Sequence, residues 1–499
     1  MKELSHDDLL EHFSAPVFRT IGQTADRLGV ECYVVGGYVR DLFLERKSVD
    51  IDIVVVGSGV DFALEVAKDM GKPHHLSVFR NFGTAQLKVR GLELEFVGAR
   101  KESYNRGSRK PIVEDGTLED DQNRRDFTIN AMAVCLNAGR YAELVDPFDG
   151  MWDLRDRIIR TPLEPEVTFS DDPLRMMRCV RFATQLGFSV EEETMSALGA
   201  MKERIGIVSG ERVSDELQKI LKSPAPSLGF ILMHESGLLS LVLPELEALS
   251  GVEKRCGRGH KDNFRHTLEV LDNVARESDN LYLRWAALLH DIGKATTKRY
   301  DERLGWTFHS HNIAGAHMVP QIFRRLHLPL GEEMKYVQKL VNLHMRPSAI
   351  ADDEVTDSAV RRLMFEAGEH LDDLMILCRA DITSRNNEKK ERFRQNFIEV
   401  QKRIVELREK DAHRTYQPPV SGEVIMKAFD IPASNTVGMI KTQIKEAIWN
   451  SRIDGDYDSA YRLMLEVARK DFGLEEKRPV SFEEAVEMDK KKHASKAES

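Results

Sequence analysis

Apolar and polar positions follow two different periods along the chain, and the change of period divides it. Up to about residue 160, short apolar runs alternate with helical patterns, which predicts an α/β or α+β unit. The strand-like runs are CYVV, IDIVVV, TAQLKV, LELEFV and AMAVCL. From Asp171 onward, apolar residues recur at steps of three and four, as in RMMRCVRFATQLGF, which is typical of amphipathic helices. The pattern therefore predicts a mixed N-terminal unit followed by a mostly helical remainder.

Two further breaks divide the helical remainder. The stretch 251–262 is rich in glycine and charge and separates two helical arrays, and a long charged helix begins near residue 387. We expect this helix to be a connector whose charges form its solvated face, leading to a small helical tail. The predicted parts of the chain are residues 1–160, 161–250, 251–386 and 387–499.

Composition limits what the chain does and where it works. A chain of 499 residues, 41% hydrophobic and 31% charged, is long enough for about three or four domains. With 72 basic and 82 acidic residues, the net charge is −10, so contact with nucleic acid must use local basic patches. The chain shows no signal pattern and no apolar run of membrane-spanning length. Its five dispersed cysteines fit reduced thiols, so we expect a cytoplasmic protein without membrane contact.

Residues 36–56 carry the first candidate site. A Gly-Gly turn and a short helix lead into a strand with Asp50 and Asp52, whose side chains point to the same face because they are two residues apart. Clustered carboxylates repel unless a cation joins them, and Mg²⁺ bound by carboxylates and substrate phosphates is a common solution. The glycine turn offers backbone N–H groups to a triphosphate. The alternative interpretation is a tight turn before an edge strand with solvated aspartates.

The segment RRDFTINAMAV supplies positive charge. Arginine forks match phosphate oxygens bidentately, so Arg124 and Arg125 suit a triphosphate or a leaving pyrophosphate. The alternative is a pair of surface arginines at the start of an element. A further basic cluster, either a closing loop or simply a soluble one, comprises Arg100, Lys101, Arg106, Arg109 and Lys110.

The segment SDDPLRMMRCVR offers a means of choosing between bases. Asp172 before Pro173 is also an ordinary helix start, with the aspartate as cap. However, Asp172 and Arg175, three apart on one helix face, form an acceptor beside a donor. Adenine and cytosine each show an amino group next to a ring-nitrogen acceptor, and guanine and uracil reverse that order. Such a pair accepts A and C. A refused base leaves buried polar groups unpaired, and each unpaired group costs about 1–3 kcal/mol of binding free energy.

Taken together, GGYVRD, DIDIVV, RRDFTINAMA and DDPLRMMRCVRF resemble the consecutive motifs of the class II tRNA nucleotidyltransferase and bacterial poly(A) polymerase family. The similarity covers roughly residues 15–230 and touches VSGEVIMKAF and NTVGMI near the C-terminus. The resemblance implies an α+β fold, with a palm of mixed sheet and helices followed by all-α neck, body and tail domains. It also implies nucleotidyl transfer, with two Mg²⁺ ions activating the RNA 3′-hydroxyl and neutralising pyrophosphate.

The resemblance assigns roles to single residues. Asp50 and Asp52 are the implied catalytic residues and Mg²⁺ ligands, and Glu95 is either a third carboxylate or a solvated strand residue. The implied nucleotide-binding residues are Gly36, Gly37, Arg40, Arg124, Arg125, Asp126, Asn130, Asp172, Arg175, Arg178 and Arg181.

A second group of motifs, NFRHTLEV, WAALLHDIGK, HSHNIAGAHM, LVNLHMRP and CRADITS, resembles the HD phosphohydrolase superfamily. Imidazole and carboxylate ligands favour Mn²⁺, Fe, Ni²⁺ or Zn²⁺ over Mg²⁺ alone. Lys294 matches a residue that meets a substrate phosphate in relatives, and the part as a whole is either an active phosphohydrolase or an RNA-binding scaffold. The implied metal ligands are His266, His290, Asp291 and Asp381, joined by His311 and His344 where two metals bind.

We therefore expect an enzyme that adds or repairs the 3′-terminal CCA of tRNA from CTP and ATP without a nucleic-acid template. Its HD part is expected to trim 2′,3′-cyclic or 3′ phosphates from damaged ends. One alternative is a poly(A) polymerase, against which the negative net charge and the lack of strongly basic extensions argue. Another is a partial enzyme that adds only CC or only A. A third is an RNA chaperone with inert sites, against which the intact carboxylates and histidines argue. The oligomeric state stays open.

Overall fold

The computed structural model describes residues 4–71, 75–80, 83–103, 112–255, 258–259, 261–352, 356–383, 387–415, 417–449 and 452–497. Arg106, Arg109 and Lys110 of the basic cluster lie outside these residues. The chain forms two compact units, one of Met1–Asp352 with Phe365–Gln395 and one of Asp353–Met364 with Asn396–Ser499. This division is coarser than the four parts expected from the sequence, which stay a prediction.

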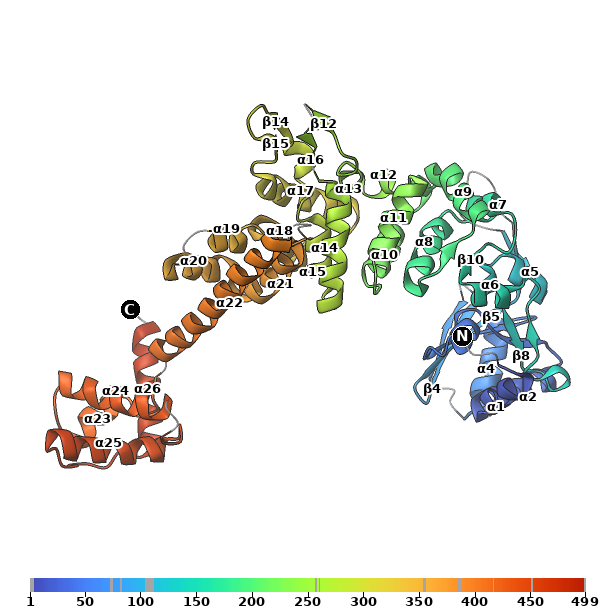
Figure 1. Ribbon diagram of the computed structural model, residues 1–499. Coiled ribbons are helices and arrows are strands. Elements are labelled where there is room, and N and C mark those ends of the chain that lie inside the picture. The colour runs from blue at the N-terminus through green and yellow to red at the C-terminus, as the bar shows by residue number, and fades with distance from the viewer. Residues whose placement is uncertain are drawn as a thin grey trace. The chain divides into compact units, whose positions relative to one another are not determined.

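A seven-stranded mixed sheet forms the N-terminal part of the first unit, in the order β3-β4-β5-β2-β1-β8-β9 (Figure 1). The five apolar runs expected as strands all lie in it, and the predicted α+β class is confirmed. β2 and β5 are parallel, whereas the other neighbouring strands are antiparallel. The strands are β1 (Cys32–Val35), β2 (Asp50–Val55), β3 (Leu76–Phe79), β4 (Thr84–Val89), β5 (Leu92–Gly98), β8 (Ala133–Cys135) and β9 (Leu144–Val145).

Helices α2 (Pro16–Leu28) and α4 (Gly59–Asp69) pack against this sheet and bury their apolar faces on it. All four residues of the interior strand β1 are buried, so the core of this part lies along the sheet. The other elements here are α1 (His6–His12), α3 (Gly37–Phe43), β6 (Arg100–Ser103), β7 (Ile112–Asp115), α5 (Leu118–Asn123), η3 (Thr128–Asn130), η4 (Ala138–Arg140) and α6 (Gly150–Asp156).

A helical stretch follows the sheet. It comprises β10 (Ile158–Ile159), α7 (Pro165–Asp171), α8 (Leu174–Leu186), β11 (Ser189–Val190), α9 (Glu192–Met201), η5 (Lys202–Ile207), α10 (Gly210–Leu221), α11 (Ser227–Ser236), α12 (Leu239–Val242) and α13 (Pro244–Glu247). α8 packs on α10. The end of α10 is held from further along the chain, because the buried guanidinium of Arg284 donates to the carbonyl oxygens of Leu221 (2.8 Å) and Ser223 (3.0 Å).

Two short β-hairpins accompany the helices of the next part, and β10 pairs with β11 in the stretch before it, so the remainder expected to be all-α is mostly helical with short strand pairs. Strands of two or three residues leave no period that a sequence pattern can show. The elements are β12 (Lys254–Arg255), β13 (Arg258–Gly259), α14 (Asn263–Glu277), α15 (Leu281–Leu289), α16 (Lys294–Thr297), β14 (Arg299–Asp301), β15 (Gly305–Thr307), α17 (His311–Arg325), α18 (Glu332–Leu343), α19 (Arg346–Asp352), α20 (Asp357–Ala367), η6 (Gly368–His370) and α21 (Leu371–Asp381).

The expected long charged helix is α22 (Asn387–Thr415), and a small helical bundle follows it. The bundle has its own apolar core, which includes Val424, Ile440 and Met464. Its helices are α23 (Gly422–Phe429), α24 (Asn435–Trp449), α25 (Tyr457–Phe472) and α26 (Phe482–Ala497). Throughout the described ranges, no helix combines the length and the apolar character needed to cross a membrane.

Candidate active site and metal centre

Three carboxylates meet where β2 and β5 run side by side. The register pairs Asp52 with Glu95, and Asp50 lies two residues before Asp52 on the same strand face. Burial raises the pKa of Asp52, and the charge of Asp50 adds to this rise while Arg125 opposes it. Burial also raises the pKa of Glu95, with Asp52 as the next contributor. These carboxylates therefore repel one another and would be stabilised by a shared cation.

Gly36 lets the chain turn tightly beside these carboxylates. Its φ of 76° lies in the left-handed region, which side chains rarely adopt. A Cβ there would stand 2.9 Å from Nη1 of Arg125 and 3.3 Å from Oδ2 of Asp52. Glycine is thus required both by the backbone and by the two charged side chains that close over it.

We expect Gly36→Ala to lower nucleotide-addition activity and to cost about 1–2 kcal/mol of folding free energy. The new methyl group strains the turn at residue 36 and displaces the side chain of Arg125. Single-turnover assays and thermal unfolding measure the two effects. Gly139→Ala is the matched control, since a Cβ at Gly139 meets nothing within 4 Å. Equal activity of the two variants would contradict the prediction.

Arg124 and Arg125 are held on one buried carboxylate. Arg124 Nε donates to Asp121 Oδ1 (2.9 Å), and Arg125 Nε donates to Asp121 Oδ2 (3.1 Å). Burial by itself raises the pKa of Asp121, but the two guanidinium groups outweigh it and hold the pKa below its usual value. Because one anion serves two arginines, a net positive charge remains for phosphate oxygens.

Asp126 is a second buried anchor. Its carboxylate accepts from Nε of Arg178 (2.7 Å) and from Nδ2 of Asn130 (3.0 Å). Burial opposes ionisation, yet Arg178 lowers the pKa of Asp126 to about 2. Asn130 in turn accepts from Nη1 of Arg40 (2.7 Å), so α3, η3 and α8 are joined by one network.

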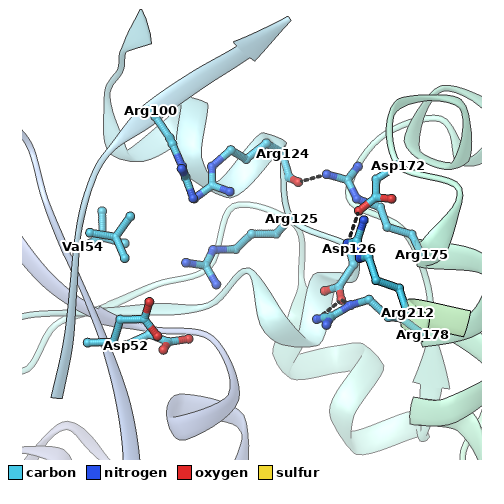
Figure 2. A pocket seen from close by; sticks show the side chains of 12 residues that line it. Asp52, Val54, Arg100, Arg124, Arg125, Asp126, Asp172, Arg175, Arg178 and Arg212 are labelled. Atoms are coloured by element: carbon cyan, nitrogen blue, oxygen red, sulfur yellow. Dashed lines mark hydrogen bonds and ion pairs between the residues drawn. The ribbon is translucent and has the colours of Figure 1, made fainter. Parts of the chain in front are cut away.

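These groups line a cavity of about 310 Å³. Figure 2 shows Asp52 on one side of it, Arg124 and Arg125 in the middle, and Asp172 and Arg175 on the opposite side. The order along the cavity is therefore carboxylates, guanidinium groups, and then an acceptor beside a donor. The lining residues are Asp52, Val54, Glu95, Val97, Arg100, Arg124, Arg125, Asp126, Asp172, Arg175, Arg178 and Arg212.

Asp172 departs from its expected place on a helix face. It lies between α7 and α8, and its Oδ1 accepts the N–H of Leu174 (3.1 Å), so it caps the start of α8. Its Oδ2 lies 3.4 Å from Nη2 of Arg212. Arg175 is 8% exposed and donates to the carbonyl oxygens of Thr168 and Arg124. Capping and cavity lining are thus both present at Asp172.

Not every residue expected to bind nucleotide lines this cavity. Arg40 and Asn130 belong to the network around Asp126, and Nε of Arg181 pairs with Glu216 Oε2 (2.5 Å). Sequence reasoning missed Arg212, because the first turn of α10 carries no motif and reaches the cavity only through the packing of α10 on α8. The expected residues outside the cavity lining are Gly36, Gly37, Arg40, Asp50, Asn130 and Arg181.

A second centre lies where five helices end or begin. His266 is in the first turn of α14, His290 follows α15, His311 opens α17, His344 follows α18, and Asp381 closes α21. Helix ends from distant parts of the sequence thus converge on one buried point. Gly293 allows this convergence, because a Cβ there would lie 2.1 Å from the carbonyl oxygen of His311.

The ligand atoms form two groups, and the carboxylate of Asp291, which belongs to one of them, also lies near the other. One group joins His266, His290 and Asp381, and the other joins Asp291, His311 and His344. Oδ2 of Asp291 lies 3.3 Å from Nε2 of His290, while its Oδ1 lies 3.2 Å from Nε2 of His311. One carboxylate therefore faces both groups, as a bridging ligand between two metal ions would.

The histidine rings are oriented for metal binding. Nδ1 of His290, His311 and His344 each lies within 2.7–2.9 Å of a backbone carbonyl oxygen three residues earlier, which fixes the proton on Nδ1 and frees Nε2. Nε2 of His290 is buried without a hydrogen bond in the described structure. Burial lowers the pKa of His344 to about 4, so its ring is neutral. The donor set fits one or two divalent metals.

Two lysines border this centre. Nζ of Lys294 lies 2.5 Å from Oδ2 of Asp291. Nζ of Lys261 lies 2.9 Å from Nδ1 of His266 and 2.5 Å from Oγ1 of Thr383. Both ammonium groups are placed to meet an anion that reaches the metal ligands.

The sheet, its three carboxylates and the arginine-lined cavity define a nucleotidyltransferase, and the converging helices define an HD domain beside it. Family comparisons agree with both. Residues 32–160 match the poly A polymerase head domain, residues 187–249 match the probable RNA- and SrmB-binding site of polymerase A, and residues 263–386 match the HD domain.

Individual relatives place the chain more closely. It is 35% identical over 339 residues to an A-adding tRNA nucleotidyltransferase of Deinococcus radiodurans, covering 66% of this chain and 75% of that protein. It is 32% identical over 373 residues to a multifunctional CCA protein of Vibrio vulnificus (strain YJ016), covering 71% and 86%. The chain therefore belongs to the tRNA nucleotidyltransferase family.

Solved structures show the same fold. A tRNA nucleotidyltransferase complexed with a primer tRNA and an incoming ATP analog is 26% identical, with a TM-score of 0.52 over 78% of this chain and 99% of that one. The apo form I of a CCA-adding enzyme, 24% identical, gives a TM-score of 0.58 over 93% and 97%. The expected resemblance to this family is confirmed.

Proposed function

We propose that the protein adds or repairs the 3′-terminal CCA of tRNA, taking nucleotides from CTP and ATP without a nucleic-acid template. The order of groups along the cavity is the observation that carries this proposal. A nucleotide whose phosphates lie near Asp52 and Arg125 presents its base to Asp172 and Arg175. A protein surface that reads the base makes a nucleic-acid template unnecessary.

In the proposed reaction, the 3′-hydroxyl of RNA attacks the α-phosphate, and pyrophosphate leaves. Asp50 and Asp52, with Glu95 beside them, would hold divalent ions, for which we propose two Mg²⁺ because all the donors are oxygens. When bound, such ions lower the pKa of the attacking hydroxyl and neutralise developing charge. Arg124 and Arg125 hold the phosphates that become pyrophosphate.

The test uses two kinds of tRNA transcript, one ending before CCA and one ending in CC, each incubated with CTP and ATP separately and together. Products longer by CCA with both nucleotides support the proposal. Addition of a single A, and only to tRNA already ending in CC, would replace it with an A-adding function. Long A tails would identify a poly(A) polymerase, and no incorporation would leave an RNA-binding protein.

An A-adding enzyme is the second candidate. The relative from Deinococcus radiodurans, at 35% identity, carries that name. The pair Asp172 and Arg175 suits both C and A and therefore does not separate the two candidates. Only the product length in the preceding experiment does so.

Asp172→Ala is expected to relax base choice. Removing the acceptor also removes the penalty on a mismatched base, so we expect use of UTP relative to CTP to rise about 5- to 150-fold. Ratios of kcat/KM measure the change. Because Asp172 also caps α8, thermal unfolding must accompany the assay, and an unchanged UTP/CTP ratio in the folded variant would contradict the prediction.

For the second centre we propose a phosphohydrolase that removes 2′,3′-cyclic or 3′ phosphates from damaged RNA ends. Nucleotide addition requires a free 3′-hydroxyl, which this removal would restore. The position of Asp291 between the two groups of ligand atoms, and the Nε2 atoms that face it, support a dinuclear site. Because imidazole donors predominate, we propose Mn, Fe, Ni or Zn there. Lys294 would bind the substrate phosphate.

We also propose a cytoplasmic location. The described cysteines, Cys32, Cys135, Cys179 and Cys378, are free and buried, which fits a reducing compartment.

A further inference from the structure

The two β-hairpins lie together beside the metal centre. β13 contacts β15, and the hydroxyl of Tyr300 on β14 lies 3.4 Å from the backbone oxygen of Arg255 on β12. In Figure 1, β12, β14 and β15 are grouped next to α16 and α17. We call β12, β13, β14 and β15 the hairpin platform.

Aromatic rings and basic groups alternate on the hairpin platform. The guanidinium of Arg255 lies over the ring of Tyr300 at 4.7 Å, and Nζ of Lys298 lies over the ring of Trp306 at 4.7 Å. The rings of Tyr300 and Trp306 meet edge to face, 5.2 Å apart at 73°. Each cation is thereby held in place by a ring, and each ring is held by its neighbour.

The platform leads directly into the metal centre along the chain. Phe308 follows Trp306 by two residues and precedes His311 by three, and Nζ of Lys294 lies 5.8 Å from the centre of the Phe308 ring. The same Nζ contacts Asp291. An alternation of aromatic and basic groups thus runs from the hairpins to a metal ligand.

The acidic groups near the platform neutralise only part of this positive charge. Oδ1 of Asp301 accepts the N–H groups of Arg303 and Leu304 (both 2.8 Å) and is occupied in the turn between β14 and β15. Glu253 pairs with Lys298 at 2.8 Å. In the part of the chain that the structure describes, the exposed Arg255 has no carboxylate partner.

We propose that the hairpin platform binds the single-stranded 3′ end of an RNA and delivers its terminal phosphate to the metal centre. Bases stack on aromatic rings and phosphates pair with fixed cations, which is how proteins hold single strands without reading their sequence. The inference rests on the proposed phosphohydrolase function of this centre. It adds the surface that holds the RNA strand next to its terminal phosphate.

The test compares two substrates of the full-length protein loaded with Mn²⁺. One is a short single-stranded RNA with a 3′-phosphate, and the other is p-nitrophenyl phosphate, which is small and has no polynucleotide strand to lie on the platform. We expect Trp306→Ala to raise KM for the RNA about tenfold without changing its kcat, since loss of one base–aromatic stack has an effect of this order. Hydrolysis of p-nitrophenyl phosphate should not change, and Trp306→Phe should restore most of the RNA affinity.

Trp152→Ala is the matched control. Trp152 on α6 is 56% exposed and carries Arg155 over its ring at 3.8 Å, so it repeats the tryptophan–cation pair away from the metal centre. A second measurement needs no turnover. Thiouridine placed next to the 3′-phosphate should photo-crosslink to the hairpin platform, and mass spectrometry identifies the peptide.

The proposal for the platform is overturned by any of three results: Trp306→Ala leaves KM for the RNA unchanged, the crosslinks map to peptides that contain none of β12, β13 and residues 298–308, or a nucleoside 3′-phosphate binds as well as the RNA. Failure of the phosphohydrolase proposal looks different. In that case the wild-type protein hydrolyses neither substrate with Mn²⁺, Fe²⁺, Ni²⁺ or Zn²⁺, and the crosslink alone decides whether the platform binds RNA.

Discussion

Replacing Asp52 with Asn is expected to reduce nucleotide addition by about a thousandfold or more, because losing a carboxylate that binds a catalytic ion removes several kcal/mol of transition-state stabilisation. The fold should not suffer. Burial and Asp50 raise the pKa of Asp52, so its charge is disfavoured in the folded protein, and a neutral amide of the same shape relieves that cost. The melting temperature is therefore expected to stay the same or rise.

Single-turnover incorporation of labelled ATP into tRNA ending in CC measures the effect of Asp52→Asn on nucleotide addition. Glu93→Gln is the matched control on the neighbouring strand, because Glu93 stands opposite Asp50 but is engaged by Lys88 at 2.5 Å and does not line the cavity. If Asp52→Asn keeps activity within tenfold of the wild type, Asp52 is not a ligand of a catalytic ion. Hydrolysis at the HD centre serves as an internal reference and should be unaffected.

Replacing Asp291 with Asn is expected to empty both metal positions of the second centre, since its two oxygens face the two ligand groups. We expect metal affinity and hydrolysis of RNA 2′,3′-cyclic phosphate to fall by at least about a hundredfold, because loss of even an outer partner of a ligand costs about 10- to 100-fold. The double change His290→Ala and Asp291→Ala should abolish hydrolysis altogether. Nucleotide addition should persist in all these variants.

Metal content per chain after dialysis, measured by mass spectrometry, reports on the Asp291→Asn prediction together with the hydrolysis rate. Asp373→Asn is the control within the same part of the chain, since Oδ2 of Asp373 accepts from the hydroxyl of Tyr336 (2.7 Å) and is not among the metal ligands. Unchanged hydrolysis in the double variant would show that the activity arises elsewhere. Unchanged metal content in Asp291→Asn would show that its carboxylate does not bridge.

Features encoded within one motif were predictable from the sequence. The positions of Asp50 and Asp52 on one strand face follow from the alternation of a β-strand, and the apolar runs gave five strands of the sheet. His290 and Asp291 are adjacent in the chain, so their proximity needs no fold. The resemblance to known families added the expectation that motifs far apart in the chain meet in one site.

Features that arise only from packing were not predictable. Arg212 reaches the cavity because α10 packs on α8, and Thr383 meets His266 across 117 positions of the chain. By contrast, the capping position of Asp172 was one of the two interpretations that the local Asp-Pro pattern offered. The hairpin platform was missed for a different reason, since its strands are too short to show a period.

Helix α10 joins the two chemistries of the chain. Its first turn carries Arg212 to the end of the cavity where Asp172 lies. About 18 Å away, at the other end of this helix of 12 residues, Arg284 of the HD part donates to the carbonyl oxygens of Leu221 and of Ser223 just beyond it. Without such donors, the last carbonyl oxygens of a helix have to hydrogen-bond to water instead. The HD part therefore supports the end of the helix whose other end brings Arg212 to the cavity, so a chain without the HD part would need another donor at the end of α10.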